Sequence, residues 1–153
     1  SIALSTLIFA SPFTHAAAVD WLNDVDGLWS DASLWSSDPA LPSGVDIVSI
    51  TNVTGLKTVT HDTGNDIIKA IITNSSARLL VNGGSSLTMN AAGSTNEGIL
   101  QAGGTSAGTL RFNGGSLANT GGELLADNDG VIDNDTQHQN KAKQGDVVDT
   151  IVH

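Results

Sequence analysis

The chain has 153 residues, of which 39% are hydrophobic and 14% charged, with 17 glycines and a formal net charge of −10 at pH 7. Such a chain is too apolar for an intrinsically disordered protein and long enough for one domain with a core. Its charge disfavours a nucleic acid or an anionic membrane surface as partner and favours a cation or a neutral glycan. Because cysteine is absent, disulfides, thiolate-bound zinc and thiol nucleophiles are excluded.

Residues 1–18 have the pattern of a secretory signal peptide. An apolar run over residues 2–9 is followed by a break at Ser11 and Pro12, and then by the small residues 16–18. The run is shorter than the ~20 residues of a membrane span. We expect cleavage after Ala18, further residues in front of Ser1, and no membrane span in the mature chain. The alternative is a buried first strand or helix of the mature fold.

Residues 19–50 contain the three tryptophans of the chain, Trp21, Trp29 and Trp35. Two prolines, Pro39 and Pro42, follow them before an apolar segment at residues 46–50. Aromatic side chains near one end of a repeat fold are typical of a cap that closes the first repeat. We therefore expect a tryptophan-containing N-terminal cap with a first strand. The alternative is an exposed aromatic platform that stacks on sugar rings.

Residues 51–135 consist of short apolar clusters separated by turn-forming residues. Together with residues 46–50, the clusters are 57–60, 67–73, 78–81, 86–89, 98–102, 109–112, 116–119, 123–126 and 130–133. Most alternate apolar and polar residues, which predicts strands with one buried face. Residues 136–153 are polar, and we expect them to form a frayed tail.

Internal repeats indicate how these strands are arranged. "LLVNGGSSL" (79–87) and "LRFNGGSL" (110–117) are near-copies, and "ILQAGG" (99–104) is a looser third. Low charge and glycine-rich corners favour a parallel β-solenoid of about four coils, each of about 20 to 25 residues. An antiparallel β-sandwich is the alternative.

The first part of the chain also resembles a known class of exported proteins. The pattern runs "W…G-x-W-S-D-A-S-x-W…P-x-G-x-D-x-V-x-I", through Trp21, Gly27, Trp29, Trp35, Pro42, Asp46, Val48 and Ile50. It resembles the opening of Gly-rich β-helical surface proteins of the autotransporter-passenger and PEP-CTERM-associated type. Leu34 departs from that pattern, which usually has Asn there. The resemblance implies a right-handed parallel β-helix on the cell surface or outside the cell. Structural or adhesive roles are common in such proteins, and enzymes are also found.

"ADNDGVIDND" (126–135) is the strongest candidate metal site. Its aspartates are Asp127, Asp129, Asp133 and Asp135. Calcium takes six to eight oxygen ligands, and D-x-D-G spacing lets alternate side chains converge. The stretch resembles the loops of thrombospondin type 3 repeats and, more loosely, EF-hand loops, although Leu125 replaces an expected acid and no bidentate Glu follows. The alternative is a solvated acidic turn that binds no metal.

The sequence offers little support for catalysis. His61 precedes Asp62, but no serine in a nucleophile turn accompanies the pair, and we expect His61 to face solvent. Arg78 and Arg111 lie one residue out of phase in the near-copies. If the copies superpose, the two side chains point to opposite faces and do not form one basic site.

These features predict a secreted or cell-surface structural or adhesive module without catalytic activity. Its partners would be a glycan, a surface protein, or another copy bound through the solenoid ends. The alternative is a carbohydrate-binding or carbohydrate-active β-helix protein that depends on calcium. The fold alone does not decide between them.

Overall fold

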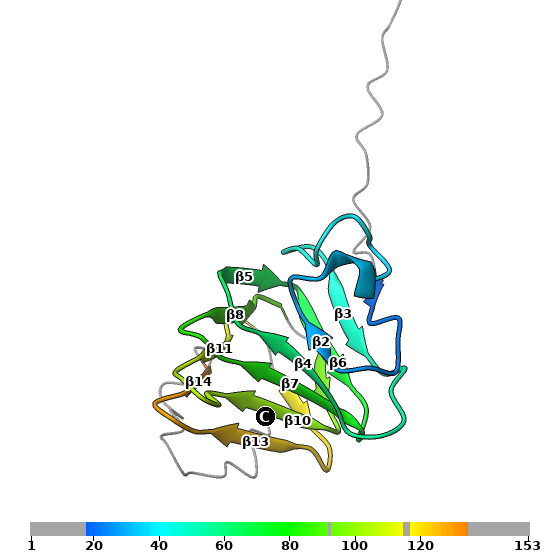
Figure 1. The fold of residues 1–153 in the computed structure, drawn as a ribbon. Coiled ribbons are helices and arrows are strands. Elements are labelled where there is room, and N and C mark those ends of the chain that lie inside the picture. Colours follow the sequence, from blue (N-terminus) through cyan, green and yellow to red (C-terminus); the bar gives the residue numbers. More distant parts are fainter. Residues whose placement is uncertain (1–17, 92, 115–116, 135–153) are drawn as a thin grey trace, which may run out of the picture.

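The computed structural model describes residues 18–91, 93–114 and 117–134. In these residues the strands form three parallel sheets that wind into a β-solenoid of about four turns (Figure 1). The described part has little helix, with one short 3-10 helix, η1 (Ala32–Leu34). Its capping residue Asp31 accepts a hydrogen bond from the Ser33 N–H at 3.1 Å.

Each sheet collects strands from successive coils. Sheet 1 contains, in spatial order, β1 (Ala18–Asp20), β3 (Ile47–Ile50), β6 (Ala70–Thr73), β9 (Ser94–Asn96) and β12 (Leu117–Asn119). Sheet 2 contains β2 (Gly27–Leu28), β4 (Lys57–His61), β7 (Ala77–Val81), β10 (Ile99–Ala102) and β13 (Glu123–Ala126). Sheet 3 contains β5 (Asn65–Ile68), β8 (Ser86–Met89), β11 (Thr109–Phe112) and β14 (Val131–Asn134).

The predicted parallel solenoid of about four coils is confirmed, and the antiparallel sandwich is wrong. Every pairing between named strands in the described residues is parallel. Among β3–β14, partners in neighbouring coils are separated by 20 residues (Lys57 and Ala77) to 24 residues (Ile99 and Glu123). The pairings of the cap strands are wider, with 29 residues between Ala18 and Ile47 and 32 between Gly27 and Val59. Stacking in register places the inward residue of each coil on that of the coil before it.

The core is a set of apolar columns inside the three sheets. Val59, Leu79, Leu100 and Leu124 form one column from sheet 2, and all four are fully buried. Leu87, Leu110 and Ile132 form another from sheet 3. Strands β3–β14, which form the coils, are only three to five residues long. Each strand therefore contributes few inward side chains to the core, and the burial of each one stabilises the fold. Burial of a leucine contributes roughly 1.5–3 kcal/mol.

A polar column runs through the same interior in sheet 1. Thr73 Oγ1 donates to Asn96 Oδ1 at 2.6 Å, and Asn96 Nδ2 donates to Asn119 Oδ1 at 2.8 Å. Asn119 Nδ2 in turn donates to the Gly122 carbonyl at 2.9 Å. These bonds satisfy polar groups that would be costly to bury unpaired. They link three successive coils through side chains at one corner.

Two local features differ from the predicted strands. The apolar run 67–73 contains a corner at Lys69 and supplies two strands, β5 and β6, in different sheets. The Lys69 N–H donates to the Asp46 carbonyl at 2.8 Å across that corner. β9 is not predicted by the apolar pattern, because its buried side chains are Ser94 and Asn96. Hydrogen bonding replaces apolar packing there.

The near-copies occupy different corners of the solenoid. Residues 79–87 run from β7 in sheet 2 to β8 in sheet 3, whereas residues 110–117 run from β11 in sheet 3 to β12 in sheet 1. The copies therefore do not superpose when coils are stacked. Arg78 lies on sheet 2 and Arg111 on sheet 3, and neither is directed into the core. The inference that they point to opposite faces required the copies to superpose, and that premise is wrong; the two arginines instead lie on different sheets.

Candidate functional site

The three tryptophans form a buried cap on the first coil. Trp21, Trp29 and Trp35 are at most 2% exposed. Trp35 lies edge-to-face with both of the others, with ring centroids 4.8 Å apart in each pair. Trp35 Nε1 also donates to the Trp29 carbonyl at 2.8 Å. The predicted cap is confirmed, and an exposed stacking platform is wrong because these rings are covered.

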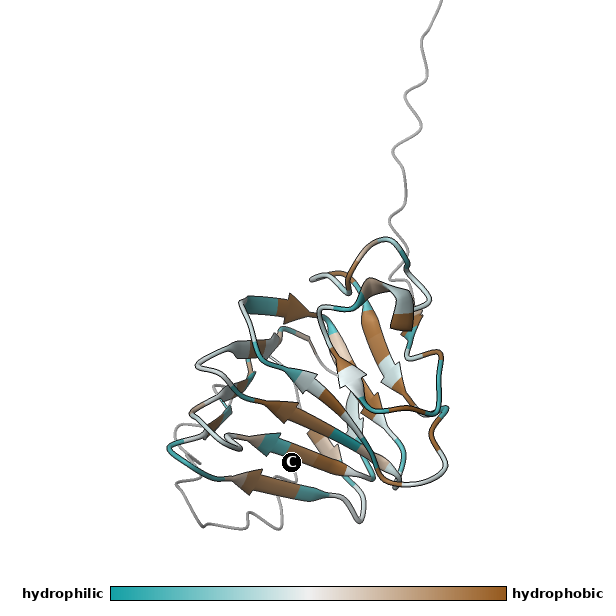
Figure 2. Cartoon of the chain, viewed as in Figure 1, coloured by the Kyte–Doolittle hydropathy of each residue, from teal (hydrophilic) through white to brown (hydrophobic). Residues whose placement is uncertain are grey.

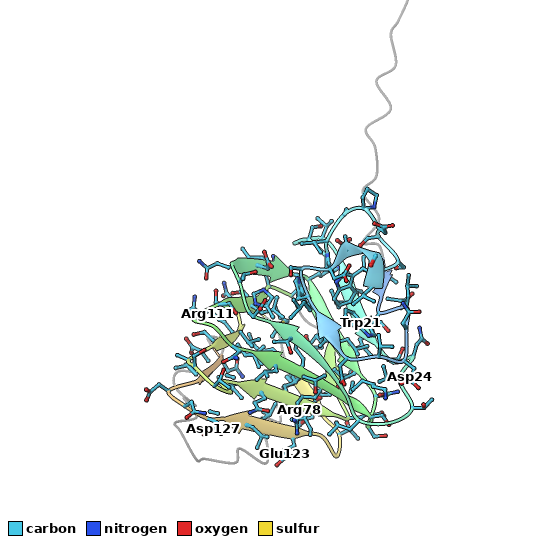
Figure 3. The ribbon with its side chains drawn as sticks, viewed as in Figure 1. Trp21, Asp24, Arg78, Arg111, Glu123 and Asp127 are labelled. Carbon is cyan, nitrogen blue, oxygen red and sulfur yellow. The ribbon has the colours of Figure 1, made fainter. Side chains whose placement is uncertain are left out.

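Backbone hydrogen bonds join this cap to sheets 1 and 2. The Trp21 N–H donates to the Ser49 carbonyl at 2.9 Å, and Trp21 and Trp35 form an isolated antiparallel bridge. The Trp29 N–H donates to the Thr60 carbonyl at 2.8 Å in sheet 2. The cap therefore continues the ladders of two sheets. Figure 3 shows Trp21 beside the first strands of the solenoid.

Two acidic side chains of the cap accept hydrogen bonds from the loop before β4 and from β4 itself. The Thr54 N–H donates to Asp24 Oδ1 at 3.1 Å, and the Thr54 hydroxyl donates to Asp24 Oδ2. Asp26 Oδ1 accepts from the Thr58 N–H at 2.6 Å. Bonds from the Thr54 hydroxyl, and then from its N–H, hold the pKa of Asp24 below its ordinary value of 3.8.

This shift predicts an acid-sensitive cap. The ionised Asp24 contributes stability above pH 3.8, and that contribution is lost as the pH falls through its lowered pKa. The variant Asp24→Asn lacks the contribution at neutral pH, so its acid-unfolding curve should converge with the wild-type curve at low pH. Tryptophan fluorescence measures both curves. Asp38→Asn is the control, because Asp38 has no side-chain hydrogen bond within the described ranges; equal changes in both variants would contradict the assignment.

His61 lies inside the molecule and not in solvent, so that expectation is wrong. Its ring is fully buried, and Nε2 lies 2.9 Å from Asp66 Oδ2 while Nδ1 lies 2.8 Å from Ser85 Oγ. The Trp29 ring covers it at a centroid distance of 5.5 Å. Asp66 is five residues away and Ser85 is one coil further along. Neither partner could be identified before the coil length was known.

The Asp66–His61–Ser85 arrangement resembles a hydrolase triad in composition but not in surroundings. Ser85 is only 3% exposed, and its Oγ lies 2.8 Å from the His61 carbonyl and 2.7 Å from the Asn82 carbonyl. A hydroxyl has a single proton, so donation to a carbonyl leaves its lone pairs for a ring N–H. A nucleophile must reach a substrate carbonyl, and this hydroxyl is covered and already bonded. The cluster therefore joins the first two coils and the cap.

The predicted calcium ligands lie at and after the corner between β13 and β14. Asp127 and Asp129 are exposed in that turn, and Asp127 Oδ1 accepts from the Asn128 N–H at 2.9 Å. Asp133 lies on β14, where its Oδ2 is 3.6 Å from Arg111 Nε. Asp135 lies outside the described residues. Within the ranges the structure describes, no group of three or more His, Cys, Asp or Glu is placed to hold a metal. Calcium binding stays a prediction.

The outer face of sheet 2 spans five stacked strands. We define it by nine residues in two columns: Leu28, Thr60, Leu80, Gln101 and Leu125, and Thr58, Arg78, Ile99 and Glu123. Most are half-buried, and Leu28 is 47% exposed. Apolar residues recur along the strands of this sheet (Figure 2). The face therefore combines apolar and uncharged polar side chains with two charged ones, Arg78 and Glu123.

Charge is sparse on this face. Arg78 and Glu123 lie in one column with Ile99 between them, and Figure 3 shows both at the same end of the sheet. Neither forms an ion pair with another described residue. The Arg78 Nε atom is buried and has no hydrogen-bond partner in the described part of the chain.

Comparison with protein-family models, curated proteins and solved structures found no match to this chain. Across the described ranges, no helix is both long enough and apolar enough to cross a membrane.

Proposed function

We propose that this protein is a non-catalytic structural or adhesive module that acts outside the cell or on its surface. The observation that carries the proposal is the outer face of sheet 2, which spans five stacked strands and combines apolar side chains with few charges. Surfaces of this kind favour contact with another macromolecule. The capped stack beneath supplies a stiff support, because each coil is hydrogen-bonded to its neighbours.

The proposed partner is a glycan or a surface protein. The solenoid fold is compatible with several functions, so the contact surface must be tested directly. We propose to immobilise the folded chain on beads and to measure their retention under flow on mucin, collagen, chitin and cellulose. Retention on at least one surface is expected. Retention on none would contradict the adhesive role.

A single substitution tests whether sheet 2 makes the contact. Leu80→Glu places a charge at the centre of this face and should reduce retention by roughly tenfold, as loss of a central apolar contact does in interfaces. Ile67→Glu is the control, because Ile67 is 50% exposed on β5 in sheet 3. Circular dichroism establishes that both variants fold. Equal retention by wild type and Leu80→Glu would exclude sheet 2 as the contact surface.

The same preparation tests the carbohydrate-active alternative. Incubation with the polysaccharides used as surfaces should release no reducing ends and no unsaturated products. Product release that increases with protein concentration would overturn the non-catalytic assignment. The buried tryptophans cannot stack on a sugar without opening the cap, so this alternative needs another binding surface.

Export is proposed on the pattern of residues 1–18 alone. A reporter enzyme that is active only after export, fused behind residues 1–18, should become active and should lose the segment by cleavage after Ala18. β1 begins at Ala18, so a mature chain that starts at residue 19 keeps most of this strand. An intact fusion that stays inside the cell would contradict the proposal.

Calcium is proposed as a stabiliser of the turn that contains Asp127 and Asp129. Binding to the folded chain raises stability by RT ln(1 + [L]/Kd), which is about 2.7 kcal/mol at 100 times Kd. For a domain of this size, that corresponds to an increase in Tm on the order of 5–10 °C. The increase should occur with calcium, not with EDTA, and should disappear in Asp127→Asn/Asp129→Asn. Equal Tm values with calcium and EDTA would eliminate the metal site.

A further inference from the structure

The chain contains the same four residues, Asn-Gly-Gly-Ser, at positions 82–85 and 113–116. Asn82 and Asn113 are the two asparagines of the sequence that precede glycine. An asparagine side chain can react with the backbone of a glycine that directly follows it. The backbone nitrogen of the glycine attacks the asparagine Cγ, ammonia leaves, and a five-membered succinimide forms. Water then opens the ring to aspartate or isoaspartate.

The structure gives these two asparagines different surroundings. Asn82 is held by the next coil, since its Nδ2 donates to Thr105 Oγ1 at 3.1 Å. Its Oδ1 accepts from the Ser106 N–H and hydroxyl, each at 2.9 Å. The attacking group is held too, because the Gly83 N–H donates to Ser106 Oγ at 2.9 Å. Both reacting groups must lose these bonds before the ring can close.

Asn113 lacks these restraints. It is exposed, as is Gly114, and its backbone N–H donates to the Met89 carbonyl at 2.7 Å. Among the residues that the structure describes, none forms a hydrogen bond with its side chain. No described group accepts from the Gly114 N–H either. Within the described residues, therefore, no hydrogen bond holds the amide or the attacking nitrogen away from the other.

We propose that Asn113 is a site of spontaneous deamidation and that Asn82 is protected from the same reaction by Thr105 and Ser106. The reaction needs only water, releases ammonia, and oxidises nothing. Its aspartate product adds a carboxylate after β11, and its isoaspartate product adds a methylene group to the backbone there. The peptide between Asn113 and Gly114, directly after β11, is thus the chemically labile one of the two.

Peptide mapping by mass spectrometry tests this proposal. The folded protein is incubated in mildly alkaline buffer, and the conversion of each amide to an acid is followed over time. Asn113 should convert at least about tenfold faster than Asn82, since only Asn82 must first lose several hydrogen bonds. In denaturant the two rates should be similar, because the local sequences are identical. Equal rates in the folded protein would overturn the proposal.

A variant tests the cause of the protection. Ser106→Ala removes the hydroxyl that contacts both Asn82 Oδ1 and the Gly83 N–H, and Ser106 is exposed, so the fold should tolerate the change. The rate at Asn82 should rise several-fold toward that at Asn113, whose own rate should not change. Ser37→Ala is the matched control in the cap. An unchanged Asn82 rate in folded Ser106→Ala would show that these bonds do not protect it.

Discussion

Replacing Trp35 with alanine is expected to lower the free energy of unfolding by about 3–5 kcal/mol, the range for deletion of a buried aromatic ring. Trp35 is fully buried between Trp21 and Trp29, and its Nε1 donates to the Trp29 carbonyl. The substitution removes both edge-to-face contacts and this hydrogen bond. A domain is typically stable by 5–15 kcal/mol, so a large share of the total would be lost.

Urea unfolding followed by circular dichroism measures this effect. Trp35→Phe is the control, because phenylalanine keeps an aromatic ring and loses only the indole N–H and part of the volume. It should cost clearly less than alanine. Leu41→Ala, at a 38% exposed position between the cap and β3, should cost less still. Equal stabilities of wild type and Trp35→Ala would contradict the role of the cap.

Gly103→Ala should destabilise the solenoid by about 2–5 kcal/mol, the sum of left-handed strain and overpacking. Gly103 has a φ of +83°, and a Cβ there would lie 1.7 Å from the Asp127 carbonyl oxygen of the next coil. That oxygen also accepts from the Gly130 N–H at 2.7 Å. Relief of the clash must therefore displace the corner between β13 and β14.

Gly84→Ala separates the destabilisation caused by backbone strain from that caused by the steric clash. Gly84 has a similar φ of +75°, but no atom lies within 4 Å of its added Cβ. It should lose only about 1–2 kcal/mol through backbone strain. Thermal melts of both variants give the comparison. If Gly84→Ala and Gly103→Ala are equally stable, the close approach of coils at Gly103 is not a constraint.

Much of the fold can be predicted from the sequence because most inward side chains are apolar and alternate with polar ones. Strands such as β3 and β8 follow this pattern directly. β9 does not, because Asn96 satisfies its buried amide through Thr73 and Asn119. The corner at Lys69 also lacks a glycine, so nothing in the sequence divides the apolar run there.

The candidate sites depend on contacts between coils and are harder to predict. His61 gains its partner Ser85 from the following coil, and Asn82 is held by Ser106 in the same way. The repeat spacing in the sequence gives the approximate coil length but not the register between neighbouring strands. That register decides which side chains of successive coils come into contact. The near-copies even suggest a false register, because they represent two different corners. The tryptophan cap is easier to predict, because three large aromatic side chains in one short segment are most readily buried against one another.

Successive coils stack in parallel register, and this stack displays the outer face of sheet 2. Thr60 and Leu80 are register partners that both point outward, and the chain has no cysteine. Adjacent strands are roughly 4.8 Å apart, which suits a disulfide. Thr60→Cys/Leu80→Cys should therefore form an intramolecular disulfide under mild oxidation. Thr60→Cys/Gln101→Cys, with β7 between the two sites, should not. A folded protein that fails to link residues 60 and 80 would contradict the solenoid register and the surface built on it.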